Sequence, residues 1–197
     1  MKTSMIKSFK NLSVLFILCF FAGCSDNNER KEIGENIIND NADLFVSNLY
    51  TISPENTQIF LIKKVSGGDF IDEHCDSIVE MEGLNLVENC KKELYEFLNK
   101  EGFDINENTK YVSFDLEKFP SKRTVKLIVD EQEIREKEYI EVSFSNFYID
   151  NKLEKGFVIV RESNLSNGRY GGKVEIYFFE NKGNRWKLYK NEMLLTA

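Results

Sequence analysis

The chain has 197 residues, 26 basic and 33 acidic side chains, a formal net charge of −7, and 16 phenylalanines and 8 tyrosines against only two prolines. The net negative charge argues against a nucleic-acid-binding protein, and against binding anionic lipid headgroups through a generally basic surface. The aromatic content argues for a packed core rather than a disordered stalk.

The amino terminus has three regions in a fixed order. Three lysines within the first ten residues make a positive leader, Leu12 to Ala22 form an eleven-residue apolar run, and Phe21-Ala22-Gly23 come directly before Cys24. This order is the layout of a secretory signal peptide. The run is well short of the roughly 20 apolar residues that a membrane-spanning helix needs. We therefore expect residues 1–23 to be a cleaved signal peptide with no place in the fold.

The residues around Cys24 resemble the lipobox of bacterial lipoproteins, with Phe21 where that family usually has leucine. The resemblance implies that Cys24 receives a diacylglyceryl thioether and, after cleavage, a further acyl chain such as palmitate on its new amino group. Two or more buried chains attach a protein stably, because each buried methylene contributes about 0.8 kcal/mol. We expect a permanent membrane anchor at Cys24. The alternative is cleavage nearby, with Cys24 left as an ordinary thiol.

The residue after the cysteine bears on location within the cell envelope. In Gram-negative lipoproteins an aspartate there resembles an inner-membrane retention signal, so Ser25 favours the outer membrane. The run Asp26-Asn27-Asn28-Glu29 resembles the acidic tags that send some lipoproteins to the cell surface. The expected location is the outer membrane, on either its periplasmic or its surface face.

Removal of the leader takes away three lysines and no acid, so residues 24–197 carry 23 basic against 33 acidic side chains, a net charge of −10. Residues 24–31 are polar and without apolar periodicity, which predicts a lipid attachment site and short tether. Residues 32–197 are predicted to form a single globular domain.

The first half of this domain is predicted to contain two helices and a strand. Apolar positions recur at helical spacing from Glu32 to Leu49, which indicates one amphipathic helix. Thr57 to Val65 is short, apolar and rich in β-formers, and is predicted to be a strand. Residues 84–100 show the clearest helical pattern, and Gly102 follows where a C-terminal cap belongs.

The second half is predicted to consist of short strands separated by turn residues, among them Asp150-Asn151, Asn167-Gly168 and Lys182-Gly183-Asn184. The predicted strands are Lys110–Asp115, Thr124–Val129, Tyr139–Ile149, Gly156–Glu162, Lys173–Glu180 and Arg185–Leu195. Helices first and strands later predict an α+β fold, with N-terminal helices packed on a mostly antiparallel, meander-type curved sheet.

The ending Lys182-Gly183-Asn184-Arg185-Trp186-Lys187-Leu188 resembles the final hairpin of cone-shaped α+β domains of the nuclear-transport-factor-2-like type, and of many uncharacterised lipoproteins. The resemblance implies that Trp186 packs beneath a curved sheet. It implies no activity, because one fold carries many functions.

Two cysteines remain besides Cys19 in the leader and Cys24. In an oxidising compartment Cys75 and Cys90 are expected to form a disulfide. The alternative is a pair of buried thiols that behave as small apolar side chains.

No stretch of the sequence predicts a cofactor or metal site. His74 is the single histidine and lies beside Cys75, but neighbours on a helix or strand point in different directions, and a bridged Cys75 could not act as a nucleophile. Asp104 to Asn108 matches the start of a calcium loop whose twelfth position is Asp115, but Thr109 replaces the required glycine, which favours a plain polar loop.

The connection from Ser163 to Gly172 is long for a hairpin and contains Arg169 and Tyr170, residue types that are enriched at binding hot spots. This loop and the absence of catalytic motifs predict a non-enzymatic module that binds an envelope protein or another envelope component. One alternative is a pocket for a small apolar or glycan ligand between the sheet and the helix at 84–100. The other is a hydrolase that works through two inward-facing carboxylates.

Overall fold

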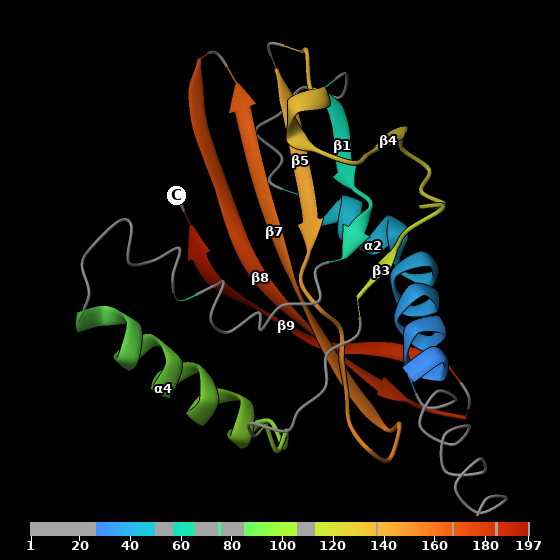
Figure 1. Cartoon of the computed structure of the whole chain (residues 1–197), viewed down its shortest axis with the longest axis vertical. Helices are drawn as coiled ribbons and strands as arrows, with labels where there is room; N and C mark the ends of the chain where they lie inside the picture. Colours follow the sequence, from blue (N-terminus) through green and yellow to red (C-terminus); the bar gives the residue numbers. More distant parts are fainter. Residues whose placement is uncertain are drawn as a thin grey trace, which may run out of the picture.

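The computed structural model describes residues 27–49, 57–65, 75, 85–105, 113–136, 138–166, 168–183 and 185–196. These residues form a mixed helix-and-strand fold around a large, open, mostly antiparallel sheet (Figure 1). Residues 27–40 are helical, and the other helices are α2 (Ala42–Ser47), α4 (Asn85–Lys100) and the 3-10 turn η1 (Glu131–Glu133). The strands are β1 (Gln58–Ile62), β2 (Lys64–Val65), β3 (Phe114–Asp115), β4 (Val125–Ile128), β5 (Tyr139–Phe144), β6 (Tyr148–Ile149), β7 (Lys155–Ser166), β8 (Arg169–Asn181) and β9 (Trp186–Thr196).

The main sheet has the strand order β4-β1-β5-β7-β8-β9, and β6 pairs with β7. Strands β5, β7, β8 and β9 pair antiparallel in sequence order, which confirms the predicted meander for this part. The meander is wrong for β1, which lies between β4 and β5 and is parallel to both. Parallel neighbours require a long crossover, and the chain between β1 and β4 is long enough to contain α4.

Helices cover both faces of this sheet. Apolar side chains of residues 27–49, among them Ile37, Phe45 and Leu49, pack in one core with alternate residues of β1, β5, β7 and β8. Leu94 and Leu98 of α4 pack in a second core on the other face, with Phe157 and Phe178. The helices therefore do not form the single N-terminal layer that the sequence predicted. Alternating strand residues enter both cores because successive strand side chains point to opposite faces.

The first helical segment begins before the predicted position and is interrupted once. Residues 27–31 are helical, so the predicted tether over residues 24–31 is wrong from residue 27 onward. Arg30 is only 7 % exposed and donates to the backbone carbonyls of Ile149, the last residue of β6, and of Asp150. A turn at Asn41, whose amide donates to the Ile37 carbonyl at 2.8 Å, separates the helix at 27–40 from α2, where one continuous helix was predicted.

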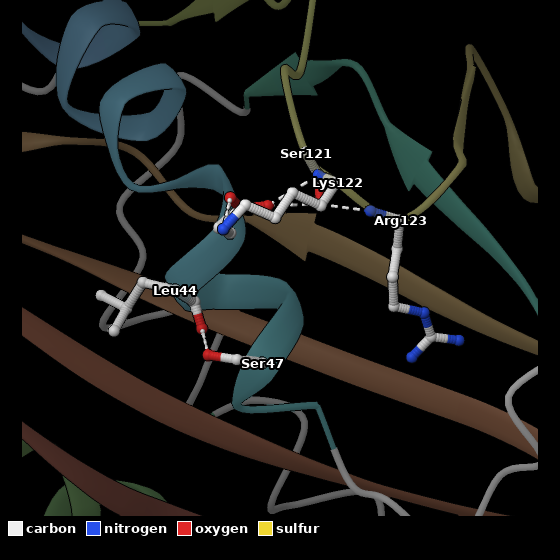
Figure 2. Close-up of polar contacts among 6 residues, drawn as sticks. Leu44, Ser47, Ser121, Lys122 and Arg123 are labelled. Carbon is white, nitrogen blue, oxygen red and sulfur yellow. Dashed lines mark hydrogen bonds and ion pairs between the residues drawn. The ribbon is translucent and has the colours of Figure 1, made fainter.

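The start of α2 is held by the segment that leads into β4. The Asp43 carboxylate accepts a 2.7 Å bond from the Lys122 backbone N–H and a 3.2 Å bond from the Ser121 hydroxyl, in the contact drawn in Figure 2. The Lys122 backbone bond lowers the pKa of Asp43. At the end of α2, the Ser47 hydroxyl donates to the Leu44 carbonyl at 2.7 Å (Figure 2).

Helix α4 confirms the prediction for residues 84–100, including its cap. Gly102 has a φ of +83°, and its N–H donates to the Asn99 carbonyl while the Phe103 N–H donates to the Leu98 carbonyl. These two bonds form a Schellman motif, and Leu98 and Phe103 belong to the same apolar core. Cys90 of α4 is joined to Cys75 by a disulfide with Cα atoms 5.8 Å apart.

The remaining strand predictions hold with local corrections. The segment predicted as one strand from Tyr139 to Ile149 is interrupted at residues 145–147, where the Ser145 hydroxyl accepts from the Ile159 N–H at 2.9 Å. Trp186 is partly buried against the core that residues 27–49 share with the sheet, in keeping with a packing role. Strand β3 covers only the end of the predicted Lys110–Asp115 strand, whose residues 110–112 lie outside the described part.

Candidate recognition surface

The connection between β7 and β8 is a tight hairpin. Ser163 pairs with Gly172, and Ser166 pairs with Arg169, so the ladder continues to within two residues of the point where the chain reverses. Gly168 has a φ of +72°, which an Asn-Gly turn of this kind requires. The predicted long loop from Ser163 to Gly172 is wrong, because Ser163, Asn164, Ser166, Gly171 and Gly172 all have cross-strand partners in the ladder. Of the predicted turn at Asn167-Gly168, Asn167 lies outside the described residues.

Arg169 and Tyr170, the two predicted recognition residues, are not brought together. They are successive residues of β8, so their side chains project from opposite faces of the sheet. Arg169 lies on the face covered by residues 27–49, because it alternates with Tyr177 and Phe179 of that core. Tyr170 lies on the face covered lower down by α4, and 80 % of its surface is exposed. The two residues therefore belong to different surfaces.

Tyr170 has two apolar neighbours on its own face. It lies opposite Leu165 of β7, which in turn lies opposite Tyr139 of β5, so the three side chains form a row across three strands. The Tyr139 ring meets the fully buried Phe60 ring edge-on, with centroids 6.3 Å apart. The row therefore runs from a partly buried ring that packs against Phe60 to a ring exposed to solvent.

Two carboxylates lie near the Tyr139 end of this row. Burial raises the pKa of Glu141, and the nearby Glu131 and Asp130 carboxylates raise it further, while Arg161 acts in the opposite direction. Burial is also the main cause of the raised pKa of Tyr139, to which Tyr170, Glu141 and Glu131 contribute. Glu131 belongs to η1, which is capped because the Asp130 carboxylate accepts the Gln132 N–H at 2.8 Å. We call Tyr139, Leu165, Tyr170, Glu131 and Glu141 the tyrosine–acid surface.

This surface has the chemistry of a cation-binding patch. An exposed aromatic face attracts an ammonium or guanidinium group, and a carboxylate beside it adds charge-assisted hydrogen bonds. The charge of Glu131 is close enough to oppose the ionisation of Glu141. A bound cation would relieve that repulsion. The sequence revealed Tyr170, but not its partners Tyr139 and Glu141, because strand register decides which residues are neighbours.

A buried ionic cluster lies on the other face. The Lys173 ammonium is 2.9 Å from a Glu175 carboxylate oxygen, and the Tyr177 hydroxyl donates to the same oxygen at 2.7 Å. Lys173 also donates to the Asn48 carbonyl, and the Asn48 amide donates to the Tyr177 hydroxyl at 3.3 Å. Burial, followed by the bond to Glu175, raises the pKa of Tyr177 above its usual value. The cluster ties the end of α2 to β8.

The cluster also contains the inward-facing carboxylates that a hydrolase would need. Glu162 lies opposite Lys173 in the ladder and is 3 % exposed, against 8 % for Glu175. The Glu175 carboxylate is already bonded to Lys173 and Tyr177, which is the arrangement of a structural ion pair. The sequence did not reveal this cluster. In the sequence the cluster is visible only as polar residues at every second position, Lys173, Glu175 and Tyr177. The same pattern is typical of the solvent-facing side of a strand.

The interface between α4 and the sheet is filled by side chains. Phe103 packs against Phe157 with ring centroids 5.0 Å apart, and Phe97 packs against Phe178 at 5.7 Å. The Lys190 ammonium lies 5.2 Å from the Phe97 ring and forms an ion pair with Glu101. The part of α4 whose side chains are described is thus core packing rather than the wall of a pocket.

The other predicted site residues are only partly described. Cys24 and His74 lie outside the described residues, as do the central residues 106–108 of the calcium-like loop. Its ends are Asp104, which is exposed, and Asp115, which lies in β3. Among the described residues no three His, Cys, Asp or Glu side chains are grouped so as to hold a metal ion, and no helix is long and apolar enough to cross a membrane.

Comparison with known proteins adds no relative to this picture. No family model, no curated protein and no solved structure matches the chain. Its function must therefore be argued from its own surfaces.

The crowding of carboxylates gives a first prediction. The raised pKa of Glu141 means that the folded state holds this proton more tightly than the unfolded state, so ionisation of Glu141 destabilises the fold as the pH rises through the raised value. Glu141→Gln should therefore raise the melting temperature at pH 7, and the gain should disappear towards pH 4. Thermal unfolding across this pH range measures it, with Glu117→Gln at an exposed distant position as the control. An equal gain at both pH values would contradict the assignment.

Proposed function

We propose that this chain is an exported envelope lipoprotein, anchored through acylated Cys24, and that its domain is a non-enzymatic module which binds a cationic segment of another envelope protein. The observation that carries the binding proposal is the tyrosine–acid surface. Tyr170, which is 80 % exposed, lies in one row with Tyr139, whose ring packs against the buried Phe60, and the charges of two carboxylates act on Tyr139.

The proposed location in the cell envelope rests on the order of positive charge, apolar run and small residues before Cys24. The disulfide between Cys75 and Cys90 agrees with an oxidising compartment outside the cytoplasm, where such bonds persist. No nucleic acid is proposed as a partner, since the mature chain carries a net charge of −10.

The choice of a cationic protein segment follows from the chemistry of the patch. Tyrosine supplies a large contact area at a small cost in side-chain entropy, and it is enriched among residues that dominate binding energy. The ordered hairpin keeps Tyr170 in place on the ladder of β7 and β8. The carboxylates select a positive partner, because like charges across an interface are unfavourable.

The experiment places a photo-crosslinking amino acid at position 170 in the full-length, membrane-attached protein, and identifies the crosslinked partner by mass spectrometry. Binding of that partner to Tyr170→Ala is then measured. We expect its Kd to rise about 30-fold, the equivalent of a loss of about 2 kcal/mol at a hot spot. Glu131→Lys should weaken binding as well, and raised salt should weaken the binding of the unaltered protein.

Arg169→Ala is the matched control, since Arg169 is the neighbouring residue on the opposite face of the same hairpin. It should change the Kd little. Equal losses of affinity in the Arg169 and Tyr170 variants, or no loss in either, would show that the partner does not bind through the tyrosine–acid surface.

A further inference from the structure

Three segments meet at the end of the sheet opposite the β7–β8 hairpin. Arg30, in the first helical turns, donates to the carbonyl of Asp150 at 3.3 Å and to the side chain of Asn151 at 3.4 Å. The backbone N–H of Asn181 donates to the Glu154 carbonyl at 2.8 Å, which joins the end of β8 to the same turn. We call this the anchor end, made of residues 27–31, the turn at 150–154, and residues 182, 183 and 185. It lies at the bottom of Figure 1.

The chain length between the lipid and the fold places the anchor end at the membrane. Only Ser25 and Asp26 separate Cys24 from the helix at residue 27. A span of three residues is at most about 11 Å, even when fully extended. Acyl chains on Cys24 would hold that residue at the level of the lipid headgroups. The start of the helix then lies about one Debye length from the bilayer surface, close enough to interact with its charges.

The exposed charges of the anchor end suit a phosphate surface. Lys152, Arg185 and Lys187 are exposed there, and they form no ion pair among the described residues. Two of the nearby acids are engaged, since the Asp150 carboxylate accepts the N–H groups of Glu154 and Lys155 at 2.7 and 3.1 Å, and Glu180 pairs with Lys182. Glu29 and Glu154 are also exposed at this end, where the cations outnumber the acids. This local excess of cations is unlike the net charge of the whole chain, which is negative.

The opposite end of the sheet carries the contrasting charge. Around η1 and the tip of the β7–β8 hairpin the chain exposes Asp130, Glu131, Glu133, Glu136 and Glu138, against the described exposed cations Arg135 and Arg169. Strand β8 runs from Arg169 at this end to Asn181 at the anchor end, 13 residues in all. At about 3.3 Å per residue, the two ends are about 40 Å apart, several Debye lengths. An anionic bilayer would attract one end and leave the other outside its field.

We infer that the anchor end is a membrane-contact surface, whose lysine and arginine side chains bind lipid headgroup phosphates, and that it orients the domain with the tyrosine–acid surface directed away from the bilayer. This inference rests on the proposed lipid anchor and adds an orientation to it. A short linker alone would keep the domain close to the membrane. The charge difference between the two ends selects which end faces the lipid.

The test uses the full acylated protein reconstituted in vesicles whose headgroups carry a nitroxide quencher. A fluorophore is attached to a single introduced cysteine, either Glu154→Cys at the anchor end or Gln132→Cys at the opposite end, both exposed positions. Vesicles contain phosphatidylcholine alone or with phosphatidylglycerol. We expect several-fold stronger quenching at position 154 than at 132. The difference should be larger on phosphatidylglycerol, and high salt should reduce that additional part.

Two charge-reversed variants separate local from overall charge. The double variant Lys152→Glu and Arg185→Glu should lose the additional quenching that phosphatidylglycerol produces. The matched control, Arg135→Glu and Arg169→Glu, changes the net charge equally at the opposite end and should retain it. Equal quenching at positions 154 and 132 would overturn the orientation. A difference that neither lipid charge nor the anchor-end reversal alters would overturn the phosphate contact.

Failure of the anchor itself is recognised separately. The mass of the amino-terminal peptide, taken from protein purified out of its own membrane, shows whether Cys24 is acylated. An unmodified Cys24 would overturn the lipid anchor and this inference together. Acylated protein with equal quenching at both probes would overturn the orientation alone, and the crosslinking at Tyr170 would still decide the binding proposal.

Discussion

Replacing Lys173 with methionine should lower the free energy of unfolding by about 3 to 5 kcal/mol, because it leaves buried carboxylate charge without its partner. The Lys173 side chain is 8 % exposed, and its ammonium lies 2.9 Å from the Glu175 carboxylate. Glu162 lies opposite Lys173 in the ladder and is also buried. Methionine fills a similar volume, so the loss reports charge and hydrogen bonding rather than packing.

Chemical denaturation at pH 7 measures this loss, and two comparisons make it specific. Lys122→Met removes the cation of an exposed pair, in which the lysine side chain is 91 % exposed, and should cost about 1 kcal/mol or less. The double variant Lys173→Met and Glu175→Gln should be more stable than Lys173→Met alone, because it removes the Glu175 charge that Lys173 compensates in the unaltered protein. Equal losses for Lys173→Met and Lys122→Met would show that the cluster is hydrated in solution.

The same cluster shows why the sequence predicts elements better than surfaces. The helix at 84–100 and its Gly102 cap follow from apolar spacing and local turn chemistry, and the structure contains both. Lys173, Glu175 and Tyr177 follow an equally regular alternation, but their polar face is buried. Periodicity shows which residues share a face of the strand. It does not show that the end of α2 buries the polar face.

The position of β1 within the sheet could not be predicted from the sequence, because local patterns do not determine which strands pair. Ile59, Phe60 and Leu61 are all buried, a continuous apolar run typical of a strand covered on both faces. This run predicts a strand at the right place. Its parallel pairing with β4 and β5 depends on chain that returns after a long crossover, which no local pattern encodes. For the same reason the predicted pair Arg169 and Tyr170 was divided between two faces, and Tyr170 was joined by Tyr139 instead.

The same strands thus hold a different helix on each face of the sheet, by different interactions. On one face, α2 is held to β8 by the ionic cluster, and on the other, α4 is held by aromatic packing and by the disulfide. The row of Tyr139, Leu165 and Tyr170 lies beyond the part of the sheet that α4 covers. A rigid sheet with an aromatic residue exposed at one end is well suited to binding, because little order has to be gained when a partner arrives.

Reduction of the Cys75–Cys90 disulfide should lower the free energy of unfolding by about 3 kcal/mol, in the view that the bond restricts the unfolded chain. The bond closes a loop of 15 residues, for which that view predicts about this value. Both cysteines pack with Leu94 and Leu98 in the core beneath α4. A loss of about 3 kcal/mol corresponds to a fall in melting temperature of about 6 to 12 °C for a domain of this size.

Thermal unfolding of the oxidised protein with and without a reductant measures this change. The double variant Cys75→Ser and Cys90→Ser is the control, because its melting temperature should be equally low and insensitive to reductant. If the protein is exported as proposed, the thiols should be blocked from alkylation when it is isolated from its own cells. Protein made without residues 1–23 in the reducing cytoplasm should react with the alkylating agent and melt at the lower temperature. Free thiols in the exported protein would contradict the proposed compartment, and a reductant-sensitive double variant would contradict the disulfide as the cause.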